Sequence, residues 1–305
     1  MISVIIPSYN SESTISKCLD ALKNQEYKGD YEIILVDSSL DRTPEIVYSK
    51  YPDIQFIHLD KKTDPGTARN MGLERSKGDL IAFIDSDCVA APDWLNRIVA
   101  AHNSEYKVVG GSVRNGNREN DMVAWAGYLA EFREFLPGKP KTEVNHIPTC
   151  NISYKKEIFE KYGVFEGIYY PQEDLVFNYK LRKNGVRILS DSSITVNHNH
   201  RSSIKSFINH QIKIGTITSR VLKEVDLEGA FIVRNILIAA IVIPFLPFIK
   251  FYRTVIAFCK YQPQVITKRP IAVIIFAVGL FFWIIGFTEG ILNSKTIATE
   301  KGGTI

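Results

Sequence analysis

The sequence has few cysteines and no strong excess of either charge. Its cysteines, Cys18, Cys88, Cys150 and Cys259, are too widely spaced for zinc-type pairs and too few for a secreted disulfide framework. We therefore expect a reducing, cytosolic setting. The net charge of +4 is only mildly basic, and the basic residues form no stripe with interleaved aromatics. This distribution argues against a nucleic-acid-binding protein.

Two kinds of N-terminal segment are also missing. The chain opens with an apolar run over residues 2–7, without the charged region, apolar core and cleavage site of a signal peptide, so we expect none. It has no glycine-rich N-terminal phosphate loop with a lysine, which argues against a nucleotidyltransferase. The long apolar runs lie instead at residues 231–251 and 271–292, and each is about long enough to cross a bilayer.

The first part of the chain alternates short apolar runs with amphipathic stretches. This alternation predicts an α/β fold with a largely parallel sheet covered by helices on both faces. The run at residues 33–36 is apolar without alternation, as burial on both faces requires. Later segments predict a strand over 108–114, helices near 155–161 and 175–183 with Gly185 as a C-terminal cap, and a strand over 194–198. We expect residues 119–140 to form an acceptor-side loop.

Polar residues follow several of these predicted strands. They are Ser8, Tyr9 and Asn10 after the first strand, Asp37 to Asp41 after the second, and Asp85, Ser86 and Asp87 after the fourth. In open parallel sheets, ligands bind beyond the carboxyl ends of the strands. These residues are therefore the first candidates for a binding site.

Asp85 and Asp87 flank one residue at the end of a predicted buried strand. In extended backbone their side chains point the same way, and two close carboxylates repel unless a cation lies between them. Hard oxygen ligands suit Mg²⁺ or Mn²⁺ bridging to a diphosphate. The alternative is an acidic turn that caps the next helix.

Residues 65–70, PGTARN, place proline and glycine at a helix start and Arg69 in its first turns, a suitable surround for a diphosphate. Together with SVIIPSYN, EIILVDSSLD, GDLIAFIDSD and PDWL, this stretch resembles the nucleotide-binding half of the inverting family-two glycosyltransferases, which have the GT-A fold. The resemblance covers roughly the first two-thirds of the chain.

The resemblance implies a role for each matching residue. Pro7, Tyr9 and Asn10 would line the base and ribose pocket, and Asp37 would accept a hydrogen bond from the nucleobase. Asp85 would lie near the ribose and metal, Asp87 would bind the metal directly, and Arg69 would lie near the diphosphate. A helix cap for Asp37 and a surface ion pair for Arg69 are the alternatives.

An acceptor hydroxyl needs a base, because it is a poor nucleophile at neutral pH. Glu173 and Asp174 precede a predicted helix and resemble the acidic pair that carries the base in this family, with Asp174 at the base position. A first-turn aspartate favoured by the helix dipole is the alternative.

Two further residues are candidates by position. His198 matches a histidine that completes the metal shell in some relatives, but a packed or surface histidine remains open. Asn151 is expected to touch the donor or acceptor sugar, and a turn asparagine is its alternative.

Processive members of this family carry the signature Q-x-x-R-W. Residues 210–213, HQIK, resemble it only distantly, so repeated polymerisation is not expected. We expect single transfer from a nucleotide-sugar to a hydroxyl of a glycan or lipid-linked acceptor, with Mn²⁺ or Mg²⁺. Transfer to polyprenyl phosphate and a membrane-anchored sugar-binding protein without turnover are the rivals.

We expect a GT-A catalytic domain over residues 1–225 and a membrane-attachment module over 226–305. The catalytic domain is expected at the cytoplasmic face of the cell membrane. Lysine and arginine residues between the two apolar runs favour the cytoplasmic side. Because Pro244 and Pro247 interrupt the first run, we expect a re-entrant or interfacial hairpin there and a full crossing by residues 271–292 only.

Overall fold

A computed structural model describes residues 1–293. Its first compact unit comprises residues 1–116, 137–167 and 173–199, and its second comprises 117–136, 168–172 and the chain from 200 onward. These compact units divide the chain at points other than residue 225. The expected domain boundary there stays a prediction. All candidate site residues named above lie in the first unit.

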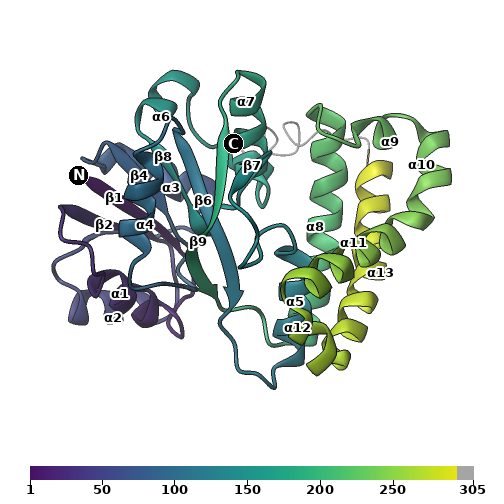
Figure 1. The fold of residues 1–305 in the computed structure, drawn as a ribbon, viewed down its shortest axis with the longest axis horizontal. Helices are drawn as coiled ribbons and strands as arrows, with labels where there is room; N and C mark the ends of the chain where they lie inside the picture. The colour runs from purple at the N-terminus through teal and green to yellow at the C-terminus, as the bar shows by residue number, and fades with distance from the viewer. Residues whose placement is uncertain (294–305) are drawn as a thin grey trace. The chain divides into compact units, whose positions relative to one another are not determined.

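The first unit is built on one nine-stranded sheet (Figure 1). The strand order is β3-β2-β1-β4-β8-β6-β9-β5, and β7 pairs with β9. The strands are β1 (Ile2–Ser8), β2 (Tyr31–Asp37), β3 (Gln55–His58), β4 (Leu80–Phe83), β5 (Cys88–Ala90), β6 (Val108–Asn115), β7 (Thr142–Val144), β8 (Ile152–Lys155) and β9 (Ile188–His198).

The sheet changes character along this order. Strands β3, β2, β1 and β4 pair in parallel, and every residue of β1 is buried, so both faces are covered there. Strand β8 pairs antiparallel with β4 and β6, and β5 and β7 pair antiparallel with β9. Strands β6 and β9 again pair in parallel, so the predicted mixed α/β sheet is confirmed, with parallel pairs in the N-terminal strands and between β6 and β9.

The helices of the first unit begin and end at residues that the sequence marks. Asp64 caps α3 by accepting a hydrogen bond from the Thr67 amide at 2.9 Å. Gly185 (φ 78°) ends α7, as predicted, and its amide donates to the carbonyl of Arg182. These helices are α1 (Ile15–Lys23), α2 (Thr43–Lys50), α3 (Pro65–Arg75), α4 (Trp94–His102), α6 (Glu157–Tyr162), α7 (Glu173–Lys183) and the short η1 (Thr149–Asn151).

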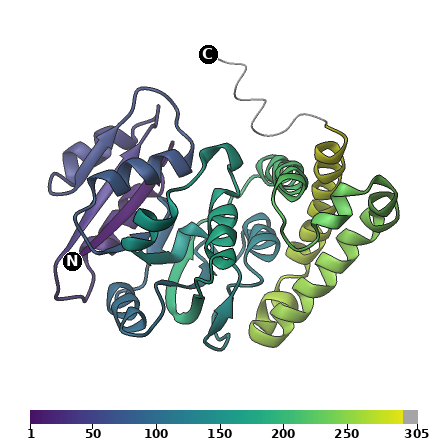
Figure 2. The same cartoon turned by 90° about the horizontal axis from the view of Figure 1, so that it is seen from above.

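The described part of the second unit is helical. Its helices are α5 (Met122–Glu131), α8 (Ile204–Glu224), α9 (Ala230–Arg234), α10 (Ile236–Val242), η3 (Ile243–Phe245), α11 (Leu246–Tyr261), α12 (Pro263–Lys268) and α13 (Pro270–Leu292), and η2 (Gly167–Tyr169) lies where the units divide. Figure 2 shows α8 and α13 side by side, as does Figure 1.

One segment of the second unit corrects the sequence analysis. Residues 119–140 were expected to form a loop, but the structure places α5 within them. Asp121 caps this helix through the Ala124 amide at 3.0 Å, and its small residues are buried. The first apolar run is interrupted at Pro244 by η3, whereas the second forms the single helix α13.

His102 predicts how the stability of the first unit depends on pH. Burial lowers the pKa of this histidine to about 4, and its ring contacts Ser153 Oγ at 2.9 Å. The unfolded chain, with an ordinary histidine pKa, binds the proton more readily, so stability should fall as pH drops from about 6.5 to about 4. We expect His102→Gln to remove about 3 kcal/mol of that pH dependence in urea unfolding. Identical pH profiles for the two proteins would contradict this assignment.

Candidate active site

Asp37 lies at the carboxyl end of β2 and is fully buried. Its Oδ2 accepts a hydrogen bond from the Ser39 amide at 3.1 Å and lies 2.8 Å from His58 Nδ1. The sequence analysis missed His58. As the last residue of β3, it lies at a strand end like the other candidates, and the same rule would have found it.

The loop after β1 is tied to the loop after β2. Asn10 adopts a positive φ of 52°, and its Oδ1 accepts a hydrogen bond from the Leu40 amide at 3.0 Å. Pro7 is buried within β1, opposite Val36. Tyr9 is 37% exposed, and Lys62 Nζ lies 4.3 Å from its ring centroid. Tyr9 and Asn10 are thus exposed in this loop, whereas Pro7 is buried in the strand before it.

Arg69 links two carboxylates that are far apart in sequence. One guanidinium nitrogen donates to Asp85 Oδ1 and the other to Glu173 Oε1, each at 2.7 Å, and Arg69 is only 3% exposed. The extended backbone expected over residues 85–87 is replaced by a turn at Ser86 and Asp87, in which the Asp85 carbonyl accepts a hydrogen bond from the Cys88 amide at 2.9 Å. The guanidinium is thus used within the protein, and its predicted place beside the diphosphate stays a prediction.

The charges of this cluster shift one another's pKa values. Burial lowers the pKa of Arg69, but the charges of Asp85 and Glu173 raise it by more, so the guanidinium stays protonated. Burial raises the pKa of Glu173 to about 7; Arg69 opposes this shift, and Asp174 adds to it. Glu173 therefore depends on Arg69 to remain ionised near neutral pH.

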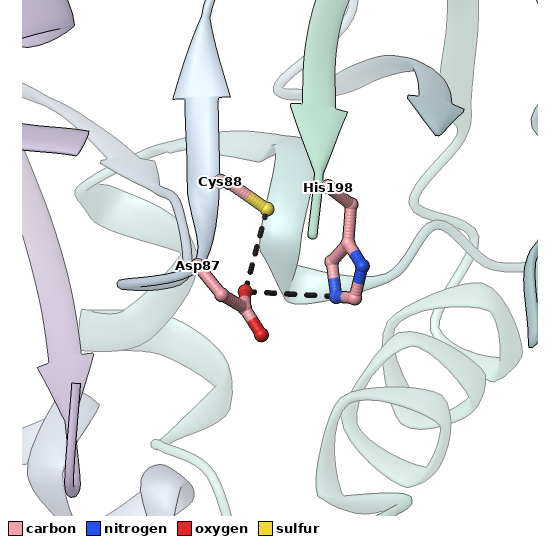
Figure 3. Close-up of side chains that lie close together, drawn as sticks. All are labelled: Asp87, Cys88 and His198. Atoms are coloured by element: carbon pink, nitrogen blue, oxygen red, sulfur yellow. Dashed lines mark hydrogen bonds and ion pairs between the residues drawn. The ribbon is translucent and has the colours of Figure 1, made fainter. Parts of the chain in front are cut away.

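Asp87, Cys88 and His198 form the group that Figure 3 shows, with their ligand atoms within 4.8 Å of one another. The pairing of β5 with β9 sets Cys88 opposite His198. His198 Nε2 lies 3.6 Å from Asp87 Oδ1, and the Asn199 amide donates to the Asp87 carbonyl at 2.9 Å. Sheet register therefore positions two of the three predicted metal ligands.

Two of the three side chains in this group, Asp87 and His198, are suitable ligands for a divalent cation. Burial raises the pKa of the Cys88 thiol well above its usual value, so the sulfur stays protonated. A carboxylate and an imidazole remain. The carboxylate suits Mg²⁺ or Mn²⁺, whereas imidazole is a ligand of transition-metal ions, so the pair fits Mn²⁺ better than Mg²⁺. Asp85 is outside the group and is held by Arg69.

Asp174 is the second residue of α7 and is half-buried. Its Oδ2 accepts hydrogen bonds from the Thr149 amide at 3.0 Å and the Thr149 hydroxyl at 3.3 Å. A hydrogen bond from Cys88 lowers the pKa of Cys150, but burial and the charges of Asp85, Asp87 and Asp174 raise it overall. Arg69 bonds to both Glu173, the neighbour of Asp174, and Asp85, so the start of α7 lies beside the turn that carries Asp85 and Asp87.

Comparison with known proteins agrees with this geometry. The model of the family "Glycosyl transferase family 2" matches residues 3–163. The chain belongs to glycosyl transferase family 2.

Relatives of this family 2 chain come from archaea and bacteria. Glycosyltransferase AglE of Haloferax volcanii is 33% identical over 170 residues, which is 54% of this chain and 55% of AglE. A dolichyl N-acetyl-α-D-glucosaminyl phosphate 3-β-D-2,3-diacetamido-2,3-dideoxy-β-D-glucuronosyltransferase of Methanococcus voltae is 26% identical over 239 residues, 73% of this chain and 74% of that protein. The match to AglE thus spans about half the length of that relative.

Solved structures share the fold. The mannosyltransferase PcManGT from Pyrobaculum calidifontis, in complex with GDP-Man and Mn²⁺, has a TM-score of 0.64 and 17% identity, covering 96% of this chain and 88% of that one. TarS 1–349 of S. aureus in complex with UDP-GlcNAc has a TM-score of 0.52 and 19% identity, covering 94% and 90%. The predicted GT-A fold is confirmed.

Asn151 has a different environment from the one expected for this family 2 chain. It is fully buried; its Oδ1 accepts a hydrogen bond from Trp94 Nε1 at 2.8 Å, and its amide group donates to the carbonyls of Ser112 and Ile194, each at 2.9 Å. Both amide hydrogens are used within the protein. The structure therefore does not support the expected contact with a sugar and places Asn151 as a tie between β6, β9 and α4.

The Arg69 bridge predicts a large loss of stability on substitution. Arg69→Met leaves Glu173 buried without its cation, and breaking a buried ion pair costs about 3–5 kcal/mol. Urea unfolding should show that loss. Arg97→Met removes an ion pair with Asp93 at the exposed surface and is the matched control, with little expected change. Equal effects of the two substitutions would argue against the bridge.

Proposed function

We propose that this chain is an inverting, metal-dependent glycosyltransferase that moves a sugar from a nucleotide-diphosphate sugar to a hydroxyl group. The observation that carries this proposal is the Arg69 bridge, which ties Glu173, the neighbour of Asp174 on α7, to Asp85 in the turn after β4 that also carries Asp87. A proton acceptor and a candidate metal-binding pair thus belong to one site.

In the proposed reaction, Asp174 takes the proton of the acceptor hydroxyl as its oxygen attacks the anomeric carbon. The bond from that carbon to the diphosphate breaks, and the nucleoside diphosphate leaves with the electron pair, so a single displacement inverts the anomeric centre. Thr149 orients the Asp174 carboxylate through two hydrogen bonds. A divalent cation held by Asp87 and His198 would neutralise charge on the leaving diphosphate.

Charge balance supports the need for a cation. Asp85, Asp87, Glu173 and Asp174 carry four carboxylates, and Arg69 supplies one cation to Asp85 and Glu173. A donor diphosphate adds further negative charge, which a bound Mn²⁺ or Mg²⁺ would offset. The neighbour PcManGT is in complex with Mn²⁺, which supports this proposal.

The proposed acceptor is a glycan or lipid-linked hydroxyl. The name of the Methanococcus voltae relative specifies a sugar linked to dolichyl phosphate as its acceptor, and that relative matches 73% of this chain. A phosphate acceptor is already ionised and needs no base, so the oriented Asp174 favours a hydroxyl over polyprenyl phosphate. The proposed donor class, a nucleotide-sugar, rests on neighbours in complex with UDP-GlcNAc and GDP-Man. These two compounds carry different nucleobases.

We also propose that the enzyme works at a membrane, with the catalytic unit on the cytoplasmic side. Residues 236–261 and 270–292 are long and apolar enough to cross a bilayer. Membrane attachment would bring the site to lipid-linked acceptors, which stay in the bilayer.

Replacing the base tests the proposed function. Asp174→Asn keeps the size of the side chain but cannot accept a proton, so turnover should fall at least about 100-fold with donor affinity nearly unchanged. Steady-state transfer from a nucleotide-sugar to a sugar-lipid acceptor measures this. Glu173→Gln is the control and should lose less, because Glu173 contacts Arg69 and is buried. Retention of more than about a tenth of wild-type turnover in Asp174→Asn would reject the base and favour a phosphate acceptor.

Replacing the proposed metal ligands tests the metal dependence of the reaction. Asp87→Asn and His198→Asn should each abolish Mn²⁺ binding in calorimetry and transfer activity. The fold of Asp87→Asn should persist, because the Asp87 side chain is 40% exposed. Activity should also disappear with a chelator and return with Mn²⁺ or Mg²⁺. Asp93→Asn, an acidic residue paired with Arg97 at the surface, is the control. Full transfer in EDTA would rule out the metal mechanism.

A further inference from the structure

The helix α13 is apolar enough to cross a bilayer, yet one of its faces is covered by protein along its length. The buried positions run from Ala272 to Ile291. Three glycines let α8 approach closely: Gly279 lies against Phe207, Gly286 against the backbone of Ile212, and Gly290 against the backbone of Thr216. The contacts advance along both helices together, so α8 runs parallel to α13 throughout.

The partner helix α8 is too polar to enter the hydrocarbon. It carries Lys205, Lys213, Arg220, Lys223 and Glu224, and it is not among the two apolar spans of the described residues. Its 21 residues make it about 32 Å long. A crossing by α13 would therefore carry these charges through a core about 30 Å thick, where charged side chains are strongly disfavoured.

The end of α13 is fixed to α8 in the same way. Lys223 Nζ donates to the carbonyls of Gly290 at 3.2 Å and Asn293 at 3.0 Å. These carbonyls belong to the last turn of the helix, where an ammonium group is favoured. If α13 crossed the bilayer, Lys223 could stay beside the end of α13 only if α8 crossed the bilayer as well.

The other apolar segment has its own obstacles. Residues 236–261 contain the interruption η3 and three cations, of which Lys250 and Arg253 lie well inside α11 and Lys260 lies near its end. Arg253 lies 3.5 Å from Glu134, and Lys250 Nζ lies 3.9 Å from the ring centroid of Trp283 on α13. Both cations thus belong to the packing of this unit rather than to a free membrane span.

The remaining faces of these helices are apolar and open. On α13 one stripe is exposed, with Phe281 at 55%, and it comprises Ile271, Ile274, Val278, Phe281 and Ile285. On η3 and α11 the exposed residues include Phe245, Phe248 and Tyr252. A stripe at this three-and-four spacing covers one side of a helix only. Open apolar patches of this kind mark interaction sites.

We propose that the second unit inserts these open faces into one leaflet of a bilayer and does not cross it. This inference rests on the proposed membrane attachment and replaces the expected crossing by residues 271–292. The exposed Lys260 and Lys268, at the connection between α11 and α13, supply cations for anionic lipid headgroups. Both ends of α13 then lie on the side of the membrane that holds the catalytic unit.

Cysteine labelling tests the sidedness. Cys259 is the exposed native cysteine, so Cys259→Ser gives the background, and Lys28→Cys reports the catalytic unit. Gln264→Cys and Asn293→Cys report the two ends of α13. Intact cells and inverted membrane vesicles are treated with an impermeant maleimide. We expect all three positions to react from the same side. Labelling of Asn293→Cys from the side opposite to Gln264→Cys would overturn the proposal, whatever the transfer activity.

Lipid binding is tested with the purified protein and vesicles of mixed zwitterionic and anionic phospholipid. Phe248→Asp combined with Phe281→Asp should reduce co-flotation at least tenfold, and high salt should weaken it. Tyr48→Asp is the matched control, because Tyr48 is 67% exposed on α2 of the first unit. Unchanged flotation of the double variant would overturn the proposal. So would a dimer of the wild type that the double variant dissociates without any flotation, since a second copy would then cover these faces.

Discussion

The candidate site depends on the buried guanidinium of Arg69. It joins Asp85, in the turn after β4, to Glu173, at the start of α7, and these residues are 88 positions apart (173 − 85). Without a cation, two carboxylates in this buried position would repel, and Glu173, whose pKa burial already raises to about 7, would take up a proton. Because Asp174 follows Glu173 directly, the same bridge fixes the start of the helix that carries the proposed base.

A second constraint is the register between β5 and β9. It sets Cys88 opposite His198 and so brings the imidazole to within 3.6 Å of the Asp87 carboxylate. Burial keeps the thiol of Cys88 protonated, which leaves a carboxylate and an imidazole as the available ligands. The pair of ligands for the proposed divalent cation is therefore set by burial at Cys88 and by the strand pairing that brings His198 to Asp87.

The second unit shows how composition and packing can point to different membrane topologies. α13 has the length and hydropathy of a span. Its glycines at 279, 286 and 290 instead bring the charged helix α8 against it, and the close backbone approach leaves no room for lipid on that face. A helix bound to a polar partner along its length keeps only one face for the hydrocarbon, which is the geometry of interfacial attachment.

The sequence by itself determined the alternating α/β pattern, the start of α3, the end of α7, and the short motifs around Asp37, Asp85, Asp87 and Asp174, because these depend on local hydrophobic periodicity, caps and spacing. It did not indicate that Asn151 is a buried structural tie, that residues 119–140 hold a helix, or that His58 contacts Asp37. Only the tertiary structure decided which partners Arg69 and α13 have. Such pairings depend on packing between segments far apart in the chain, which local patterns in one sequence do not record.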